Sequence, residues 1–508
     1  MEKYMIFNKN MSFAPLSLLD ANKNSKVMEL SLEMAKKYVE KLNQECGEEL
    51  FFYMEREKWM EIIQSSQFIE GQEKIHEEAK KIMDIPEIRK KQKELCEEND
   101  KNINGFMIPF EAVNNEDYEK KLKEKLNDFA KTIDRPAYRK DGTIVNDVKV
   151  ICKMVMDAFD ASKIGDTKKA EKIVEKILEE YKGLSFAITE LDKSYAFRGV
   201  APFDKLKQKW APEEAYKTMM DGDLNFFRAR IVKKSEILEK KEEINYLPYS
   251  MRDYANDMRF SSKGNICLYL GTTSYVCSKE CRWNGVDNLY LSSFKFNAEG
   301  KKLKILNLAV TQSLLNGTIS RPMDNPYYVQ LHNAMIRVFP LVIATMFTIT
   351  SSDEERRKFD GENAIKAEYL LSQVIMNVLS KAGIDGVAYL SRQGKDDFQY
   401  PQMVCLAIPI NDSNEENQYG ELINSYVMTP PVLYKGFFDD ITYEEKSYIN
   451  EKYPRMSKHS WGESENYLAK IDFDGKQVFY QDTPFSKMDD YLINQAHRKF
   501  VYKLYMSF

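Results

Sequence analysis

The spacing of apolar residues predicts helices in the first part of the chain. In residues 148–159 and again in residues 170–181, apolar side chains recur at steps of three and four. Gly165 lies between the two segments, where a glycine commonly ends a helix. No motif that carries chemistry is present here. We therefore expect a helical N-terminal region over residues 1–199, serving as a packing or regulatory module.

The pattern changes near residue 200, where short strand-like segments begin to alternate with helices. Ile266 to Leu270 is an apolar run between two glycines, which is typical of a buried strand. Residues 289–296 and 303–308 alternate between apolar and polar side chains around a turn, which is compatible with a hairpin. Residues 368–382 have helical spacing. Mixed strands and helices in this order predict an α+β domain over residues 200–412.

Beyond residue 412 the chain becomes polar and then regains strand and helix patterns. A hairpin is expected at residues 471–480 around Asp474-Gly475, followed by a last helix over 484–505. We expect residues 413–508 to form a C-terminal extension.

Composition excludes several classes of protein. The net charge is −5 and the pI about 5.8, so no basic field is present to attract nucleic acid. The longest apolar stretch, residues 338–347, is too short to cross a bilayer, and Met1-Glu2-Lys3 leads into no apolar run of a signal peptide. Seven cysteines are scattered without a framework. These features predict a cytoplasmic protein with no membrane association.

The familiar hydrolytic and metal-dependent sites are not indicated. The four histidines lie in no nucleophile motif. Cys277 and Cys281 stand four residues apart without a second pair, so two core cysteines are the better interpretation than a zinc site. No glycine-rich phosphate loop is present. No metal is expected.

A glutamate on a short predicted helix is the first candidate for chemistry. Over residues 272–283, helical spacing places Glu280 on the apolar face with Val276, Cys277, Cys281 and Trp283. Burying a carboxylate there costs free energy, so we expect it either to form an ion pair or to serve a function. The two interpretations are a buried ion pair, with Arg259 as the natural partner, and a functional carboxylate.

This part of the chain resembles the RES family, which is named for its Arg, Glu and Ser. The matching pieces follow the family's order: Phe227-Arg228, Arg259-Phe260, Leu268-Tyr269-Leu270, Glu280, Glu368-Tyr369 with Ser372-Gln373, and Asp385-Gly386-Val387-Ala388-Tyr389-Leu390-Ser391. The resemblance covers residues 200–412. It implies an ADP-ribosyltransferase-like fold that cleaves the nicotinamide–ribose bond of NAD⁺, with members acting as bacterial toxins. NAD⁺ is then the substrate, and no further cofactor is expected.

The resemblance assigns a role to each residue. Glu280 would stabilise the oxocarbenium-like ribose cation, as carboxylates do in glycoside hydrolysis. Arg228 and Arg259 would bind the pyrophosphate through paired donors. Tyr269 would stack on a ring of NAD⁺, and Ser391 would orient the nicotinamide or ribose. The alternatives are Arg230 in place of Arg228, a core tyrosine at 269 and a turn residue at 391.

The chain departs from the family in two places. The second arginine stands in Met258-Arg259-Phe260-Ser261 rather than a Gly-Arg-aromatic-Asn context. An insertion around residues 311–365, expected to be helical, lengthens the path from Glu280 to Ser391. These departures affect how the acceptor is bound.

Three hypotheses about function remain open. The first is an NAD⁺ glycohydrolase or phosphorylase held in check by an antitoxin or by the helical region. The second is a transferase that modifies a macromolecule. The third is a non-catalytic binding module in which Glu280 and the arginines form a structural cluster.

Overall fold

The computed structural model describes residues 4–8, 17–19, 25–27, 31–46, 51–64, 101–139, 142–184, 186–197, 225–319, 326–351, 366–394, 402–435, 470–473, 476–480 and 483–493. The chain divides into two compact units, Met1–Glu98 and Asn99–Phe508. The fold class is α+β, as the order of patterns predicts.

The first unit contains strands as well as helices. Strand β1 (Tyr4–Asn8) pairs with β4 (Phe51–Glu55), and β2 (Ser17–Leu19) pairs with β3 (Ser25–Val27), both antiparallel. Helices α1 (Leu32–Cys46) and α2 (Arg56–Gln64) accompany them. This part of the expected helical N-terminal region therefore contains strands as well as helices.

The second unit is built on a nine-stranded sheet. The order across it is β14-β9-β7-β8-β13-β12-β10-β6, with β15 also paired to β9. Neighbours are antiparallel except β10 and β12, which are parallel. The strands are β6 (Ile188–Glu190), β7 (Asn225–Val232), β8 (Cys267–Gly271), β9 (Asn288–Phe296), β10 (Lys304–Asn307), β12 (Gly386–Leu390), β13 (Val404–Pro409), β14 (Tyr426–Met428) and β15 (Val432–Leu433).

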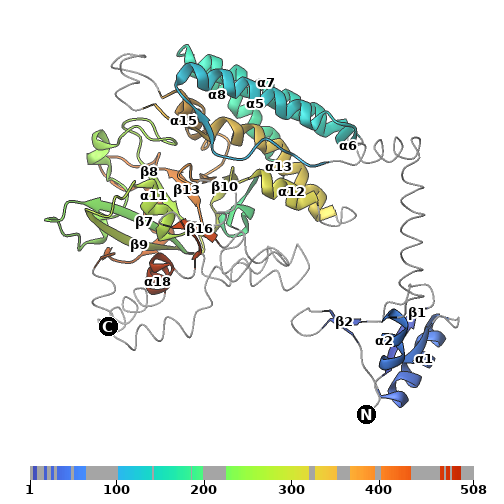
Figure 1. The fold of residues 1–508 in the computed structure, drawn as a ribbon. Coiled ribbons are helices and arrows are strands. Elements are labelled where there is room, and N and C mark those ends of the chain that lie inside the picture. The colour runs from blue at the N-terminus through green and yellow to red at the C-terminus, as the bar shows by residue number, and fades with distance from the viewer. Residues whose placement is uncertain are drawn as a thin grey trace. The chain divides into compact units, whose positions relative to one another are not determined.

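Long helices form a layer beside this sheet. Figure 1 shows α5 (Asn115–Ile133), α7 (Gly142–Lys163) and α8 (Thr167–Tyr181) side by side, with α13 (Pro326–Thr345) and α15 (Ala367–Val378) between them and the strands. The side-chain oxygens of Asn114 and Asp166 cap the first turns of α5 and α8. The apolar face that the spacing predicts for residues 170–181 is buried. In the described part of residues 311–365, where we expect a helical insertion, lie α12 (Gln312–Ile319) and α13.

Shorter elements complete the unit. Strand β5 (Phe110–Ala112) pairs in parallel with β11 (Phe347–Ile349), and β16 (Lys470–Phe473) pairs with β17 (Lys476–Phe479), the hairpin expected around residue 474. The remaining helices are α6 (Pro136–Arg139), α11 (Ser274–Glu280) and α18 (Pro484–Tyr491), with 3-10 turns η1 (Leu191–Lys193), η2 (Tyr195–Phe197), η4 (Lys241–Glu243), η5 (Tyr249–Tyr254), η6 (Gly300–Lys302) and η8 (Glu421–Ser425).

One expected strand pairing differs from the structure, and one expected boundary lies outside the described residues. Strands β9 and β10 do not form a hairpin: β9 pairs with β7, whereas β10 pairs with β12 and β6 on the other side of the sheet. Alternation identifies a strand but not its partner. The expected boundary between residues 199 and 200 lies outside the described residues. The two compact units divide at Glu98 and Asn99 instead, so α5 to α8 belong to the same unit as the sheet.

Across the part of the chain that the structure describes, no helix combines the length and apolar character needed to cross a membrane.

Candidate functional site

Strand β8 leads directly into helix α11, which carries the candidate glutamate. The hydroxyl of Thr273 caps the helix by accepting from the backbone N–H of Val276 at 3.1 Å. The helix packs closely on the strand end, because a Cβ added at Gly271 would overlap the side chains of Val276 and Cys277. Glycine is therefore required at the junction.

Helix α11 ends abruptly after Glu280. The backbone N–H groups of Arg282 and Trp283 bond the carbonyls of Lys279 and Ser278, which is the pattern of a Schellman motif. Arg282 occupies the left-handed position with φ of 54°. The chain thus turns away immediately after the carboxylate.

The structure brings together two of the residues predicted to act in catalysis. The hydroxyl of Ser391, which follows β12, donates a hydrogen bond to Oε1 of Glu280. The same Ser391 oxygen accepts from the backbone N–H of Gln393 at 3.1 Å. Because a serine hydroxyl has one proton, these two bonds direct that proton at the carboxylate.

Glu280 itself is exposed, in contrast to the expected position on a buried apolar face. The buried residues of α11 are Ser274 to Ser278, and the helix stops before Cys281 and Trp283 can extend a stripe. The ion pair expected with Arg259 as a buried partner is not formed. A carboxylate that is open to solvent, yet held by a serine that is 3% exposed, can meet an entering ligand.

Arg259 lies beside this pair as a buried cation. It is 8% exposed, and its Nη2 donates to the carbonyl of Leu390 at 3.1 Å. Its guanidinium stacks on the ring of Tyr389 at 4.2 Å. Burial lowers the pKa of Arg259, and the nearby charge of Arg392 lowers this pKa further, whereas the charge of Glu280 raises it. Arg259 therefore feels the electrostatic field of the candidate carboxylate.

Arg228 and Tyr269 occupy a split in the sheet. Strands β7 and β8 share one register pair, Phe227 with Gly271. Beyond it, Arg228 Nη1 donates to the carbonyl of Tyr269 at 3.0 Å, and Arg228 Nε donates to the carbonyl of Ile244 at 2.8 Å. Arg228 thus donates to two main-chain carbonyls, one on β8 and one in the segment between β7 and β8.

Tyr269 presents a neutral hydroxyl. Burial raises the pKa of this phenol well above its ordinary value, and the hydroxyl lies 2.9 Å from Oγ of Ser261. In the strand register Tyr269 shares a face of the sheet with Tyr389, since Gly271 pairs with Cys405 and Cys405 with Tyr389. Ser391, two residues after Tyr389, follows on that face.

Two residues of this region were missed by reasoning from the sequence. Arg392 directly follows Ser391, and its Nη1 donates to the carbonyl of Phe347. The ring of Tyr389 stacks against the guanidinium of Arg259. Tyr389 lies within residues 385–391, which resemble the RES family, and Arg392 directly follows them. Their closeness to Ser391 in the sequence could have marked both residues as candidates.

Burial raises the pKa of each cysteine that the structure describes, namely Cys152, Cys267, Cys277, Cys281 and Cys405. Burial raises the pKa of Cys267 to about 12, which keeps it a thiol near neutral pH. Within the described ranges, no group of three or more His, Cys, Asp and Glu side chains is placed to hold a metal ion.

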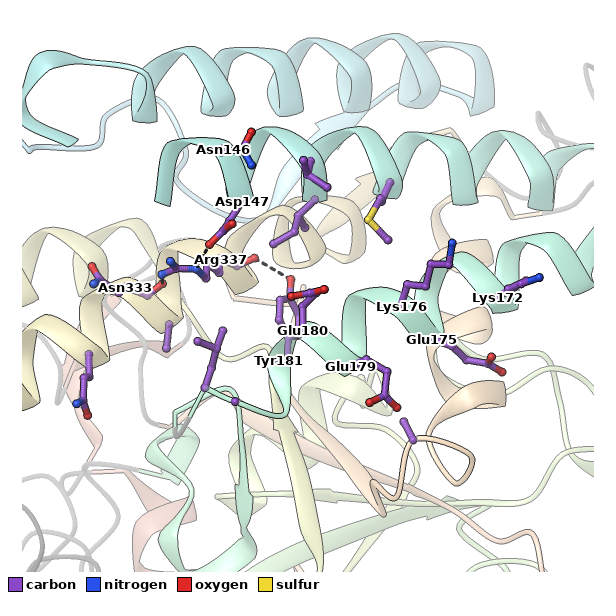
Figure 2. Close-up of a pocket in the computed structure, with 18 of the residues that line it drawn as sticks. Asn146, Asp147, Lys172, Glu175, Lys176, Glu179, Glu180, Tyr181, Asn333 and Arg337 are labelled. Atoms are coloured by element: carbon purple, nitrogen blue, oxygen red, sulfur yellow. Dashed lines mark hydrogen bonds and ion pairs between the residues drawn. The ribbon is translucent and has the colours of Figure 1, made fainter. Parts of the chain in front are cut away.

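Two pockets lie away from the Glu280–Ser391 pair. One of about 1070 Å³ opens between α7, α8 and α13, where Arg337 pairs with Asp147 at 2.8 Å and Tyr181 donates to the carbonyl of Arg337 (Figure 2). Lysines and glutamates both line this pocket, so its charge favours neither an anionic nor a cationic ligand. A second pocket, of about 590 Å³, is lined by Phe260 and Ser261, the neighbours of Arg259 and Tyr269.

Comparison with known proteins gives one distant similarity. The chain is 23% identical over 296 residues to a Bacillus subtilis (strain 168) protein named "Putative toxin YopC". The aligned part covers 55% of this chain and 61% of that relative, which is less than two thirds of its length. No protein-family model and no solved structure matches the chain.

Proposed function

We propose that this protein cleaves the nicotinamide–ribose bond of NAD⁺ and acts as a toxin by depleting it. The observation that carries the proposal is the hydrogen bond from Ser391 to Glu280, which joins two predicted catalytic residues from distant parts of the chain. Arg259 beside them supplies the cation that the same chemistry needs. The RES resemblance and the similarity to a protein named as a toxin support this reading.

The chemistry suits the residue types. When the C–N bond breaks, its electron pair goes to the nicotinamide nitrogen, so no general acid is required. Positive charge develops on the ribose, and the exposed carboxylate of Glu280 stabilises it. The oxygen of water or phosphate then adds to the same carbon, giving ADP-ribose or its 1″-phosphate. Ser391 fixes the direction of the carboxylate while this charge forms.

The ADP-ribosyltransferase-like fold of the RES type is part of this proposal. A mixed sheet that splits between β7 and β8, with the carboxylate on a helix that follows β8, supports it.

A macromolecular acceptor is the second candidate, favoured by the exposure of Glu280. An exposed carboxylate leaves room for a bulky nucleophile beside the ribose. Label from NAD⁺ that becomes attached to protein or nucleic acid would support transfer, whereas free ADP-ribose would support hydrolysis.

The direct test measures nicotinamide release from NAD⁺ by the purified full-length protein, with and without phosphate. We expect Glu280→Gln to lower the rate by about 10²- to 10³-fold. Glu299→Gln is the matched control, because Glu299 is also exposed and pairs with Lys302 nearby. Release that is absent in the parent protein, or unchanged in Glu280→Gln, would contradict the proposal.

An enzyme that depletes NAD⁺ must be kept inactive in the cell that produces it. We propose that a partner antitoxin or the first compact unit, Met1–Glu98, supplies this restraint. Expression of the chain without residues 1–98 should then be more toxic than expression of the full chain if the unit restrains, and equally toxic if a separate protein does.

A further inference from the structure

Arg259 and Arg392 both contact the short segment Met346-Phe347, close to Ser391 at the end of β12. Arg259 bonds the carbonyl of Leu390 and places its Nη1 3.7 Å from Sδ of Met346. Arg392 bonds the carbonyl of Phe347, the next residue after Met346. The two guanidinium groups are therefore neighbours at the end of β12, next to the Ser391–Glu280 hydrogen bond.

Each guanidinium is supported on an aromatic ring. The centre of Arg259 lies 4.2 Å from the Tyr389 ring centroid, and that of Arg392 lies 5.1 Å from the Tyr369 centroid. Stacking leaves the edges of a guanidinium, where its N–H groups point, available for hydrogen bonds. Within the described parts of the chain, Nε and Nη2 of Arg392 and Nε of Arg259 have no hydrogen-bond acceptor.

Among the residues that the structure describes, no carboxylate forms an ion pair with Arg259 or Arg392. Neither arginine lies within 4.0 Å of a carboxylate oxygen among the residues that the structure places. The charge of Glu280, which is held by Ser391, acts on Arg259. Glu368 is buried, and its charge and that of Arg392 both act on Tyr118. Holding two like charges close together and partly out of water is unfavourable unless an anion joins them.

Arg228 lies on β7, which β8 and β13 separate from β12, the strand that precedes Arg392. Its Nε and Nη1 donate to the carbonyls of Ile244 and Tyr269. We propose that Arg259 and Arg392 together bind the diphosphate of the dinucleotide substrate, and that Arg392 takes the place which the resemblance predicts for Arg228. This inference rests on the proposed function for the identity of the substrate.

The test is a binding measurement that needs no turnover. Inorganic pyrophosphate and ADP-ribose are titrated calorimetrically into the full-length protein and into three variants. Arg392→Gln should weaken both ligands by about 10- to 100-fold, because a charge-assisted hydrogen-bond pair is lost. Arg392→Lys should fall between, since it keeps the charge without the planar fork. Arg139→Gln, at an exposed position on α6, should bind as the parent does.

The outcomes separate this inference from the proposed function. Equal affinity in Arg392→Gln and the parent, or loss that Arg392→Lys does not partly restore in a folded protein, overturns the diphosphate site. Loss of pyrophosphate binding in a protein that releases no nicotinamide supports the anion site and contradicts the proposed function. Nicotinamide release with an unchanged KM in Arg392→Gln supports the function and contradicts the site. Thermal unfolding of each variant shows that it is folded.

Discussion

Ser391 donates a hydrogen bond to Glu280 across 111 positions of sequence, at the point where β12 and α11 both end. The buried partner is the serine and the exposed one is the carboxylate. This arrangement fixes the direction of a charged group without removing it from solvent. It also predicts that the two residues act as one unit.

A double-mutant cycle tests this unit. Ser391→Ala should lower the rate of nicotinamide release mainly through kcat, because Glu280 loses the donor that orients it. The double variant Ser391→Ala/Glu280→Gln should be no slower than Glu280→Gln alone, since residues that act together are not additive. Effects that multiply would show that the serine acts independently of the carboxylate.

Arg228 should contribute to stability. Arg228→Met removes donors from the carbonyls of Ile244 and Tyr269, and each charge-assisted hydrogen bond contributes about 1.5–3 kcal/mol. We expect the free energy of unfolding in urea to fall by about 3 kcal/mol, with a smaller loss in Arg228→Lys. Arg230→Met, at the exposed neighbouring position, is the control. A stable Arg228→Met protein would show that these carbonyls find other donors.

His332 should make stability depend on pH. This side chain is 1% exposed beside Tyr138, and burial, together with the charge of Lys101, lowers its pKa from 6.5 to about 4. Between these values the unfolded chain binds a proton that the folded chain does not. Stability is therefore complete above pH 6.5 and falls as the pH drops towards 4, by about 3 kcal/mol in total.

The check is chemical denaturation at several pH values with His332→Gln beside the parent. The difference in unfolding free energy between the two proteins should change by this amount between pH 7 and pH 4. A difference that stays constant with pH would mean that His332 titrates normally in the fold.

Arg282 lies in a left-handed conformation at the end of α11, with φ of 54°. Glycine adopts this conformation without the steric cost that a Cβ brings. Arg282→Gly should therefore raise the free energy of unfolding by up to about 1 kcal/mol. Arg282→Ala removes the same side chain but keeps the Cβ, so it should give no such gain. Thermal unfolding of the two variants distinguishes them.

The local elements follow from the sequence to a large extent. Helical spacing predicts the buried faces of α7 and α8, and the apolar run before Gly271 predicts β8, because each pattern records which side of an element avoids water. The resemblance to the RES family singled out Glu280, Ser391 and Arg259, together with Arg228 and Tyr269. The structure places the first three near one another.

The tertiary structure decided the partners of these elements. It separated β9 from β10, placed Glu280 in solvent, committed Arg228 to two carbonyls and set Arg392 beside Arg259. None of these follows from periodicity, because the pairing of a strand and the acceptors of a guanidinium depend on segments that are far apart in the chain. The sequence by itself determines which face of an element is buried, whereas the packing of the whole unit determines what that face meets.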